Sequence, residues 1–387
     1  MQEPIRLGVS GLGGFGQFAL DAFAQTPEVR VVAVHDVDAE RAARIGAAAG
    51  AAVCSTYAAL VTHPEVEVVY LATPPSAHGP QVLEALRHGR HVFVEKPLAT
   101  SLIEAGAIAH RAAEAGLRVG INYVLRFNPI YRLARRIAQS GLLGSLRHMS
   151  LENDAADEKL QPDHWFWDPS VSGGIWVEHG VHFFDIAAYL AGAAGEIAYS
   201  QAWRRGPQGP VDRVAAVARF GAVPATFYHA FDKPDRIERT TFRLAFDVGY
   251  LDILGWMPVA LEAEAVLDET GLSALTALVS GGVLEMGAGR TAPIRADLDL
   301  VEPYLGEHRQ TRGRWADREV SHRVKLRVEC PEGKMAVYAR TVQAGVADFA
   351  RSVRDPSYQP EVPLAHAVAS LDMAAAAAGV SHAPARP

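Results

Sequence analysis

Three residues in this sequence combine acid–base side chains with a spacing that suits proton transfer. Glu178 and His182 stand four residues apart in a segment with helical periodicity, residues 175–190, so they share one face of the expected helix. Lys96 lies within Glu95-Lys96-Pro97, directly after an apolar run that predicts a strand. An alcohol carbon that gives up a hydride also releases one proton. A histidine with an ordinary pKa accepts that proton, so turnover would rise with pH near neutrality. Each residue alone has a plainer reading, as a surface lysine or a satisfied core histidine, and the spacing by itself favours the plainer reading for His182.

A glycine-rich turn near the start of the sequence predicts a dinucleotide site. Its residues Gly11, Leu12, Gly13, Gly14, Phe15 and Gly16 match G-x-G-x-x-G between a strand-like run and a helix-like segment. In that setting Gly11 permits the tight turn, Gly13 lets the backbone approach a pyrophosphate, and Gly16 lets the helix pack on the strand. The helix N-terminus then offers backbone N–H groups to the phosphates. Glycine-rich turns also form for packing alone, so the prediction depends on this context.

Asp36 ends the second expected strand, twenty residues after Gly16. A carboxylate at this place accepts hydrogen bonds from the adenosine ribose and repels a 2′-phosphate, which favours NAD over NADP. Arg41 and Arg44 follow on the next helix and keep that preference modest. The plainer reading is a turn whose acidic residues, in the stretch 36–40, cap the following helix.

The elements that must position these residues alternate between strand and helix over the first 120 residues. Short apolar runs predict strands, and amphipathic segments predict helices. The expected strands are 5–9, 29–34, 66–72, 91–94 and 117–121, and the expected helices are 15–25, 55–62, 76–89 and 101–115. This alternation predicts a parallel sheet covered on both faces. Because ligands bind at the carboxyl ends of parallel strands, Thr73, Pro74, His78 and Lys96 are expected to face one crevice.

The pattern changes after Asn128-Pro129. Expected helices at 131–139, 175–190, 341–351 and 364–378 accompany a strand at 146–152 and short strands at 214–220, 225–231, 241–247 and 250–254. Turn residues separate these short strands, as in antiparallel sheets. We therefore expect an α/β fold with two domains: a doubly wound, parallel Rossmann sheet in residues 1–123, and an α+β domain with an open, mostly antiparallel sheet in residues 124–387 that binds substrate and mediates oligomerisation.

Two features of the sequence, a group of possible metal ligands and an aromatic loop, each allow two interpretations. Glu178, His179 and His182 offer carboxylate and imidazole groups close together, but no H-E-x-x-H pattern and no further ligand accompany them, so no metal is expected. The loop 163–168 contains His164-Trp165-Phe166-Trp167. Its aromatic side chains suit stacking on a sugar ring, with Trp165 as a substrate contact, and equally suit a buried contact between subunits.

Several segments, taken in order, resemble the Gfo/Idh/MocA oxidoreductase family, which includes glucose–fructose oxidoreductase and inositol 2-dehydrogenase. They are residues 11–16, 72–78, 94–99 and 122–129, followed by residues 173–185, which resemble the helix of the family's second domain. The resemblance covers nearly the whole chain. The ordered Glu-Lys-Pro and Gly-x-His-x-x-Asp pieces are specific, whereas the glycine-rich turn alone is not.

The resemblance implies a role for each matching residue. Lys96 would be the active-site lysine, His182 the general base, and Glu178 the partner carboxylate. The family usually has Asp at the place of Glu178 and Gly at the place of Ile175, so the catalytic share of Glu178 is open. Substrate contacts would come from Lys96, Arg126, Trp165, Glu178, His179 and His182. Cofactor contacts would come from Gly11, Gly13, Gly14, Phe15, Gly16, Asp36, Thr73, Pro74, His78, Glu95, Lys96 and Asn122.

Composition sets the remaining limits. The 387 residues suffice for two domains, and 49% hydrophobic residues allow a sizeable core. A net charge of −7 argues against nucleic-acid binding, and the two cysteines, Cys54 and Cys330, fit a reducing compartment. Apolar runs stay below the ~18 residues of a membrane span, and the N-terminal sequence lacks a signal-peptide pattern. A cytoplasmic protein is therefore expected, and the resemblance adds a homo-oligomer, either a dimer or a tetramer.

The expected function is NAD-dependent oxidation of a hydroxyl carbon of a sugar, inositol or related polyol. Three alternatives stay open on the sequence alone. These are cleavage of a glycoside with transient use of bound NAD, reduction of an imine or a linear tetrapyrrole, and a catalytically silent protein that senses a sugar or NAD.

Overall fold

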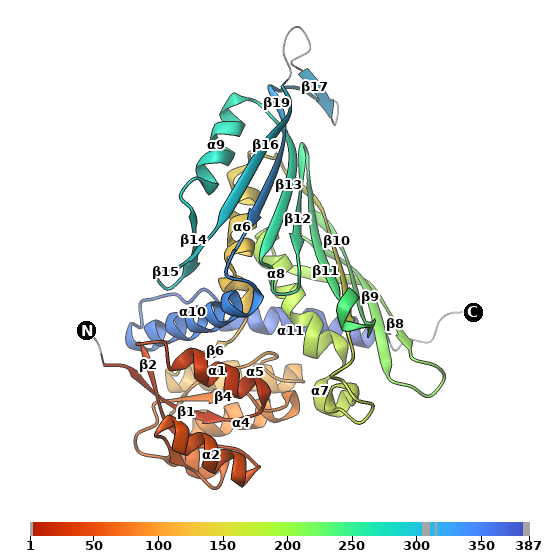
Figure 1. Ribbon diagram of the computed structural model, residues 1–387. Coiled ribbons are helices and arrows are strands. Elements are labelled where there is room, and N and C mark those ends of the chain that lie inside the picture. Colours follow the sequence, from red (N-terminus) through yellow and green to blue (C-terminus); the bar gives the residue numbers. More distant parts are fainter. Residues whose placement is uncertain (1–2, 304–309, 314–315, 382–387) are drawn as a thin grey trace. The chain divides into compact units, whose positions relative to one another are not determined.

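The computed structural model describes residues 3–303, 310–313 and 316–381 (Figure 1). Within them the chain forms two compact units. The first contains the residues up to Val124 together with Pro162–Asp185 and Ala339–Ala378, and the second contains Leu125–Gln161 and the described part of Ile186–Tyr338. This division is more interleaved than the contiguous one expected from the sequence, because two later segments pack on elements of the first 124 residues.

The first unit is built on a six-stranded parallel sheet with the order β3-β2-β1-β4-β5-β6. Its strands are β1 (Ile5–Ser10), β2 (Val29–His35), β3 (Ala52–Val53), β4 (Val68–Leu71), β5 (His91–Val94) and β6 (Val119–Ile121). Apart from the exposed two-residue β3, these strands are short apolar runs with most side chains buried, as a sheet covered on both faces requires. The expected Rossmann sheet is confirmed, and its strand order reverses between β1 and β4, where such folds bind ligands.

Helices with local start and stop signals connect these strands. They are α1 (Gly14–Phe23), α2 (Ala39–Ala49), α3 (Tyr57–Thr62), α4 (Pro75–Arg87) and α5 (Leu102–Ala115). The side chains of Asp38, Thr56 and Ser101 accept N-cap hydrogen bonds at the starts of α2, α3 and α5. Gly116 ends α5 in the left-handed region, with φ 64°. Strand β3 was not predicted from the sequence, and α2 was expected only as a helix after the acidic stretch 36–40, without bounds.

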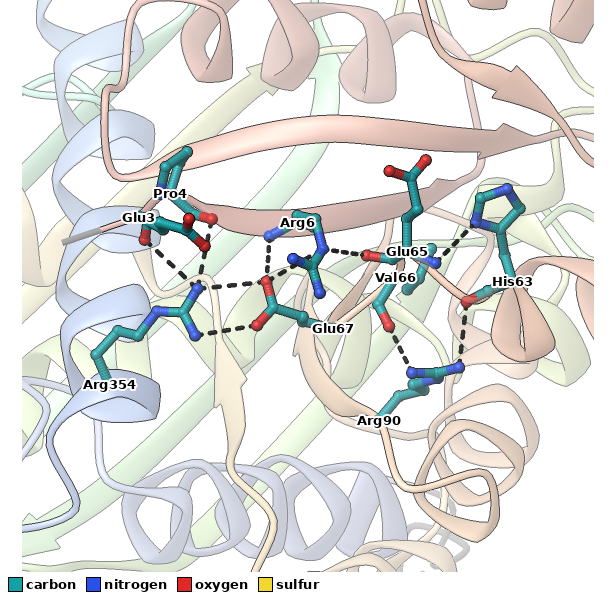
Figure 2. A network of polar contacts seen from close by, with 9 residues as sticks. All are labelled: Glu3, Pro4, Arg6, His63, Glu65, Val66, Glu67, Arg90 and Arg354. Atoms are coloured by element: carbon teal, nitrogen blue, oxygen red, sulfur yellow. Dashed lines mark hydrogen bonds and ion pairs between the residues drawn. The ribbon is translucent and has the colours of Figure 1, made fainter.

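The later helices α10 (Lys334–Arg354) and α11 (Leu364–Ser381) return part of the chain to the first unit. The ring of Phe349 in α10 stacks on Phe93 of β5, with centroids 5.1 Å apart, and a Cβ on Gly120 would lie 2.4 Å from that ring. At the end of α10, the Arg354 guanidinium donates to Glu67 at 3.0 Å, and the N–H of Arg6 donates to the same carboxylate (Figure 2). Burial opposes the charge on Glu67, but these donors lower its pKa overall.

The second unit is built on a nine-stranded sheet with the order β16-β19-β13-β12-β11-β7-β10-β9-β8. The pair β10–β7 is parallel and every other neighbouring pair is antiparallel, which confirms the mostly antiparallel sheet. The strands are β7 (Leu146–Ala156), β8 (Gly195–Arg204), β9 (Val211–Phe220), β10 (Val223–Lys233), β11 (Arg239–Phe246), β12 (Gly249–Leu254), β13 (Ala260–Leu267), β16 (Arg295–Pro303) and β19 (His322–Glu329). Several are longer than the short strands that the sequence predicted.

Helices α6 (Pro129–Ser140) and α9 (Glu269–Val279) contact the inner strands of this sheet, and Figure 1 shows them on one of its faces. The other face carries exposed side chains, including Tyr250 and an ion pair between Arg243 and Asp252 at 2.7 Å. The remaining elements are the hairpins β14 (Val283–Gly287) with β15 (Arg290–Pro293) and β17 (Gln310–Gly313) with β18 (Ala316–Glu319), and the 3₁₀ turns η1 (Val124–Phe127) and η4 (Asp235–Ile237). In the described part of the chain, no helix combines the length and apolarity needed to cross a membrane.

Candidate active site

Lys96 and Glu178 lie far apart in the sequence but meet in the first unit. Lys96 follows β5 at the carboxyl end of the parallel sheet, and its peptide bond to Pro97 is cis. Its ammonium donates to the main-chain oxygen of Glu178 at 2.6 Å and forms an ion pair with the Glu178 carboxylate. The side chains are only 17% and 13% exposed, so water screens this pair weakly. An ammonium has three donors, and the third has no partner among the described residues.

A wide helical turn presents Glu178 to Lys96. Residues Trp176–Gly180 form the π-helical turn η3, and α8 (Val181–Ala191) follows directly, where the sequence predicted one regular helix. The Trp176 ring lies over Gly180, because a Cβ on that glycine would be 2.6 Å from the ring. Trp176 also stacks on Phe184 at 5.2 Å. Single π-helical turns are rare in proteins, and many of those that occur lie at functional sites. Here the turn allows the carbonyl oxygen and the carboxylate of one residue to hold the same cation.

His182 begins the next turn of this segment as a buried, uncharged group. Burial, reinforced by the nearby charge of Lys96 and by electrostatic interaction with His179, holds the pKa of His182 well below its ordinary value. The same effects of burial and Lys96 lower the pKa of His179 to about 3. His182 is 8% exposed, and its Nδ1 has no hydrogen-bond partner among the described residues. The imidazole is thus uncharged across the neutral range, and it does not titrate near neutrality as the sequence suggested.

A second carboxyl group lies beside the lysine. Glu95 accepts hydrogen bonds from Asn122 at 2.7 Å and from Tyr70 at 2.5 Å. Burial raises the pKa of Glu95 to about 7, against the lowering effect of these donors and of Lys96. The Oδ1 atom of Asn122 is buried and has no partner among the described residues. Glu95, and not His182, is therefore the group of this site that changes charge near neutrality.

His78 joins the two loops that carry these groups. Its Nδ1 lies 2.7 Å from the carbonyl oxygen of Pro97, and its Nε2 lies 2.8 Å from that of Thr73. The side chain is buried, so both ring nitrogens are used inside the protein. The Thr73 hydroxyl in turn donates to Gln81 at 2.7 Å. His78, expected from the sequence to contact the cofactor, thus acts in this structure as a link between the β4 and β5 loops.

The glycine-rich turn has the form that a pyrophosphate requires. Gly11 has φ 90°, and a Cβ there would lie 2.5 Å from the Ala72 carbonyl oxygen. A Cβ on Gly16 would lie 2.1 Å from the Gly11 oxygen, whereas Cβ atoms on Gly13 and Gly14 would enter open space. No side chain caps the N-terminus of α1, so its N–H groups are available to an anion. These features, with the unpaired acceptor on Asn122, fit a dinucleotide whose phosphates lie over Gly13 and Gly14.

Asp36 lies at the carboxyl end of β2, within reach of the same turn. Its Oδ2 accepts the Leu12 N–H at 2.7 Å, and its Oδ1 accepts the Asp38 N–H at 2.9 Å. The side chain is 5% exposed. The carboxylate is thus fixed beside the glycine-rich turn, where the ribose of a dinucleotide would need an acceptor.

The other predicted substrate contacts are distributed between the units. Trp165 is 36% exposed in the 3₁₀ turn η2 (Trp165–Trp167), near α7 (Pro169–Ser172), whereas the neighbouring Phe166 is buried. Arg126 belongs to the second unit, where its guanidinium lies 5.2 Å from the centre of the Tyr189 ring. No group of three His, Cys, Asp or Glu side chains suited to a metal occurs in the described residues.

Replacing Trp165 with alanine is expected to raise KM for the substrate severalfold while the protein keeps its oligomeric state. The reason is its exposure on a turn that belongs to the same unit as Lys96 and His182. Kinetics and size-exclusion chromatography on the same variant measure the two effects. Ile103→Ala, which removes a large apolar side chain that is 86% exposed on α5, is the control for loss of an exposed apolar group away from the turn. Weakened assembly with an unchanged KM would instead assign the turn to a subunit contact.

Sequence reasoning did not single out two aromatic residues of this site. Tyr70 lies within β4 and donates to Glu95, and the Tyr123 ring lies 5.9 Å from that of His182. In the sequence Tyr70 resembles an ordinary core residue of an apolar strand, and its neighbours do not indicate that it belongs to the site. Tyr123 stands beside Asn122 in the segment that carried the resemblance, so its position was the available signal.

Comparison with known proteins gives two matches to family models. One, described as an oxidoreductase family with an NAD-binding Rossmann fold, matches residues 5–123. The other, described as the GFO/IDH/MocA C-terminal domain, matches residues 131–251. A protein named scyllo-inositol 2-dehydrogenase (NAD(+)), from Bacillus subtilis (strain 168), is 31% identical over 196 residues, which are 50% of this chain and 56% of that protein. The chain thus spans about half the length of the curated relatives that it matches.

Solved structures agree over nearly the whole chain. A levoglucosan dehydrogenase in complex with NADH and levoglucosan has a TM-score of 0.73 at 18% identity and covers 98% of this chain and 97% of its own. The biliverdin reductase of Synechocystis sp. PCC 6803, in complex with biliverdin and NADP+, has a TM-score of 0.66 at 16% identity, with 97% and 99% covered. At these identities the likeness concerns the fold. The two complexes hold different nicotinamide cofactors, NADH in the first and NADP+ in the second.

Proposed function

Because this chain belongs to the Gfo/Idh/MocA oxidoreductase family, we propose that it is an NAD-dependent dehydrogenase acting on a secondary hydroxyl carbon of a sugar, inositol or related polyol. The observation that carries this proposal is the ion pair between Lys96 and Glu178, because Glu178 belongs to the helical segment that also carries the buried, uncharged His182. Inositol and sugar dehydrogenases among the similar proteins support the substrate class.

In this proposal each residue of the site has one task. The bound nicotinamide supplies the hydride acceptor, or the donor in the reverse direction. Lys96 donates its free N–H to the reacting oxygen and lowers its proton affinity. His182 takes the proton that the hydroxyl loses as the carbonyl forms, so hydride and proton are both accounted for. Glu178 fixes the position of Lys96 and balances its charge.

The direct test follows NADH absorbance while the protein is incubated with NAD and a panel of inositols, sugars and related polyols. Steady accumulation of NADH that depends on one of these substrates is the expected result. Substrate consumption without net NADH would instead indicate that the cofactor is recycled, as in glycoside cleavage. Failure to bind either nicotinamide dinucleotide would remove the enzymatic proposal.

We also propose that Asp36 makes NAD the preferred cofactor. Asp36→Ser is expected to lower the ratio of kcat/KM with NAD to kcat/KM with NADP by about 10-fold. The substitution removes both an acceptor for the ribose hydroxyls and a charge that repels the 2′-phosphate. Steady-state kinetics with both cofactors measure the ratio. Asp21→Ser removes an exposed carboxylate from α1 and serves as the control. A preference of the wild type for NADP would contradict the assignment.

The remaining proposal concerns assembly. Tyr199 and Val217 face each other across β8 and β9 and are 53% and 40% exposed. Further along the sheet, ion pairs such as Arg243–Asp252 offer charges of both signs. A second copy of the chain, paired face to face on this sheet, would cover the apolar part and match the charged part. Size-exclusion chromatography of Tyr199→Asp, which should weaken the oligomer, tests this.

A further inference from the structure

The two ring nitrogens of His78 in α4 face acceptors of the same kind. Nδ1 lies 2.7 Å from the carbonyl oxygen of Pro97, and Nε2 lies 2.8 Å from that of Thr73. A carbonyl oxygen only accepts hydrogen bonds, so both nitrogens must donate if both contacts are hydrogen bonds. A neutral imidazole has a single N–H, and only the imidazolium has two. The arrangement in this structure is therefore that of protonated His78.

Both distances agree with this assignment. Hydrogen bonds from a charged N–H are typically about 2.7–2.9 Å long, whereas those between neutral groups cluster near 2.9–3.0 Å. In a neutral ring, one nitrogen would direct its lone pair at an oxygen less than 3 Å away. The side chain is 1% exposed, so bulk water does not reach it to replace the missing donor. Loss of the proton therefore forces one of the two carbonyl groups to move away.

The surroundings of His78 favour loss of this proton. Burial lowers the pKa of His78 and Lys96 acts in the same direction, whereas the two carbonyl oxygens and Glu178 raise it. Among the groups on the helices packed against α4, the carboxylate of Glu104 lies beside the residue that follows His78, and Tyr57 donates its hydroxyl to α4. Burial raises the pKa of Tyr57 and keeps it uncharged. The imidazolium thus prevails in acid and loses its proton below the ordinary histidine value.

The two carbonyl groups belong to segments with different positions in the site. Thr73 lies between β4 and α4, against the glycine-rich turn, because a Cβ on Gly11 would be 2.8 Å from the Thr73 nitrogen. Pro97 directly follows Lys96, which pairs with Glu178. His78 therefore connects the segment beside the glycine-rich turn with the segment that carries the lysine.

We propose that His78 is a proton-dependent positioning residue: as an imidazolium it holds the carbonyl groups of Thr73 and Pro97 together, and as a neutral ring it holds one of them and releases the other. At neutral pH the remaining N–H supports one segment, and proton uptake in acid fixes both. The consequence for Lys96 and for turnover rests on the proposed function, whereas the proton-dependent contact itself requires neither cofactor nor substrate.

The first test follows the wild type without cofactor between about pH 5 and pH 8. NMR of protein labelled with ¹⁵N in its histidine rings reports the protonation of His78, whose signals are identified by their absence in His78→Gln. Amide hydrogen exchange, expressed as protection relative to the intrinsic rate, reports residues 76–77 and 98–99. We expect two protonated ring nitrogens in acid and one above the transition, where the protection of one segment falls about 10-fold or more. Unchanged protection of both segments across the transition would overturn the inference, as would a neutral ring throughout.

The second test separates the donors of His78 from its bulk. His78→Phe keeps a ring without a donor and should lower kcat about 10-fold, with the Kd of NAD changed less than about 3-fold. His78→Gln offers an uncharged amide as its only donor, like the neutral ring. It should recover most of the lost kcat, and its protection should no longer depend on the protonation of residue 78. His110→Phe, at an exposed position on α5, is the control.

The outcomes distinguish this inference from the proposed function. Equal losses of kcat in His78→Phe and His78→Gln would show that the donors do not position the site, and the inference would be wrong. A wild type that forms no NADH with any substrate would remove the proposed function, while the NMR and exchange measurements would still decide the inference. Those measurements also decide it if circular dichroism shows that His78→Phe does not fold.

Discussion

Replacing Lys96 with alanine is expected to lower turnover about 100-fold or more while the affinity for NAD stays nearly unchanged. The lysine has two of its donors on Glu178, so its remaining N–H is fixed in direction before any substrate arrives. Its loss removes the donor to the reacting oxygen and leaves the Glu178 carboxylate buried without its cation. Both changes act on the chemical step, so kcat should fall more than KM changes.

Titration of NAD beside steady-state kinetics on the same preparations separates these effects. Lys96→Arg keeps the charge but not the compact ammonium, and it should recover little activity. Lys159→Ala removes an exposed lysine and should behave as the wild type. Glu178→Asp restores the commoner family residue but shortens the carboxylate that reaches Lys96, so a loss of activity is expected here as well. Near-wild-type turnover of Lys96→Ala would remove this lysine from the mechanism.

His182→Ala is expected to lower turnover in the oxidation direction by about 100-fold or more, since it removes the only proposed proton acceptor. The pKa of His182 lies well below its ordinary value because of burial. The imidazole is consequently uncharged at and below neutral pH, and its titration should not shape the pH profile there. His110→Ala, which removes an imidazole that is 73% exposed on α5, is the control for the loss of a histidine.

The pH profile should instead report Glu95. Its pKa of about 7 predicts that kcat/KM rises with pH through that value, as the carboxylate forms and stabilises the ammonium of Lys96. Glu95→Gln should remove this rise, whereas the residual activity of His182→Ala should keep it. A rise that disappears in His182→Ala and survives in Glu95→Gln would reverse the two assignments.

Stability gives a second readout for Glu95. A carboxyl group whose pKa is raised on folding stabilises the protein fully below its unfolded pKa and loses that contribution as pH rises through the folded value. The Tm of the wild type relative to Glu95→Gln should therefore fall between the ordinary carboxyl range and about pH 7. Thermal unfolding of both proteins without ligand across this range measures the difference.

The sequence was sufficient for the parts of the molecule whose signals are local. The glycine-rich turn, the apolar runs of the parallel sheet and Asp36 at the end of β2 each depend on neighbours along the chain. The strands β13, β16 and β19 were not predicted, because charged residues occupy the strand positions that face away from the core and made these segments resemble polar loops. In the folded sheet these charges are paired across strands, as between Arg323 and Glu264.

The chemistry of the site depended on contacts that no local pattern contains. Lys96 and Glu178 are separated by 82 positions, and their pairing requires the complete first unit. The π turn that presents Glu178 arises where the Trp176 ring covers Gly180, which the helical periodicity of the sequence conceals. Similarly, burial fixes the titration of Glu95 and His182, and it can be judged only when all the covering elements are in place.

The return of α10 to the first unit limits how this protein can be recombined with its relatives. A chimaera made at a single crossover after residue 123 would join one parent's parallel sheet to another parent's Phe349 and Arg354. Phe349, which packs beside Gly120, would then come from a different parent than Gly120. Arg354, which neutralises Glu67, would likewise come from a different parent than Glu67. Such a hybrid would also divide Lys96 from its own Glu178. Exchange of specificity between relatives should therefore succeed only when the three segments of the first unit, residues 1–124, 162–185 and 339–378, are taken from the same parent.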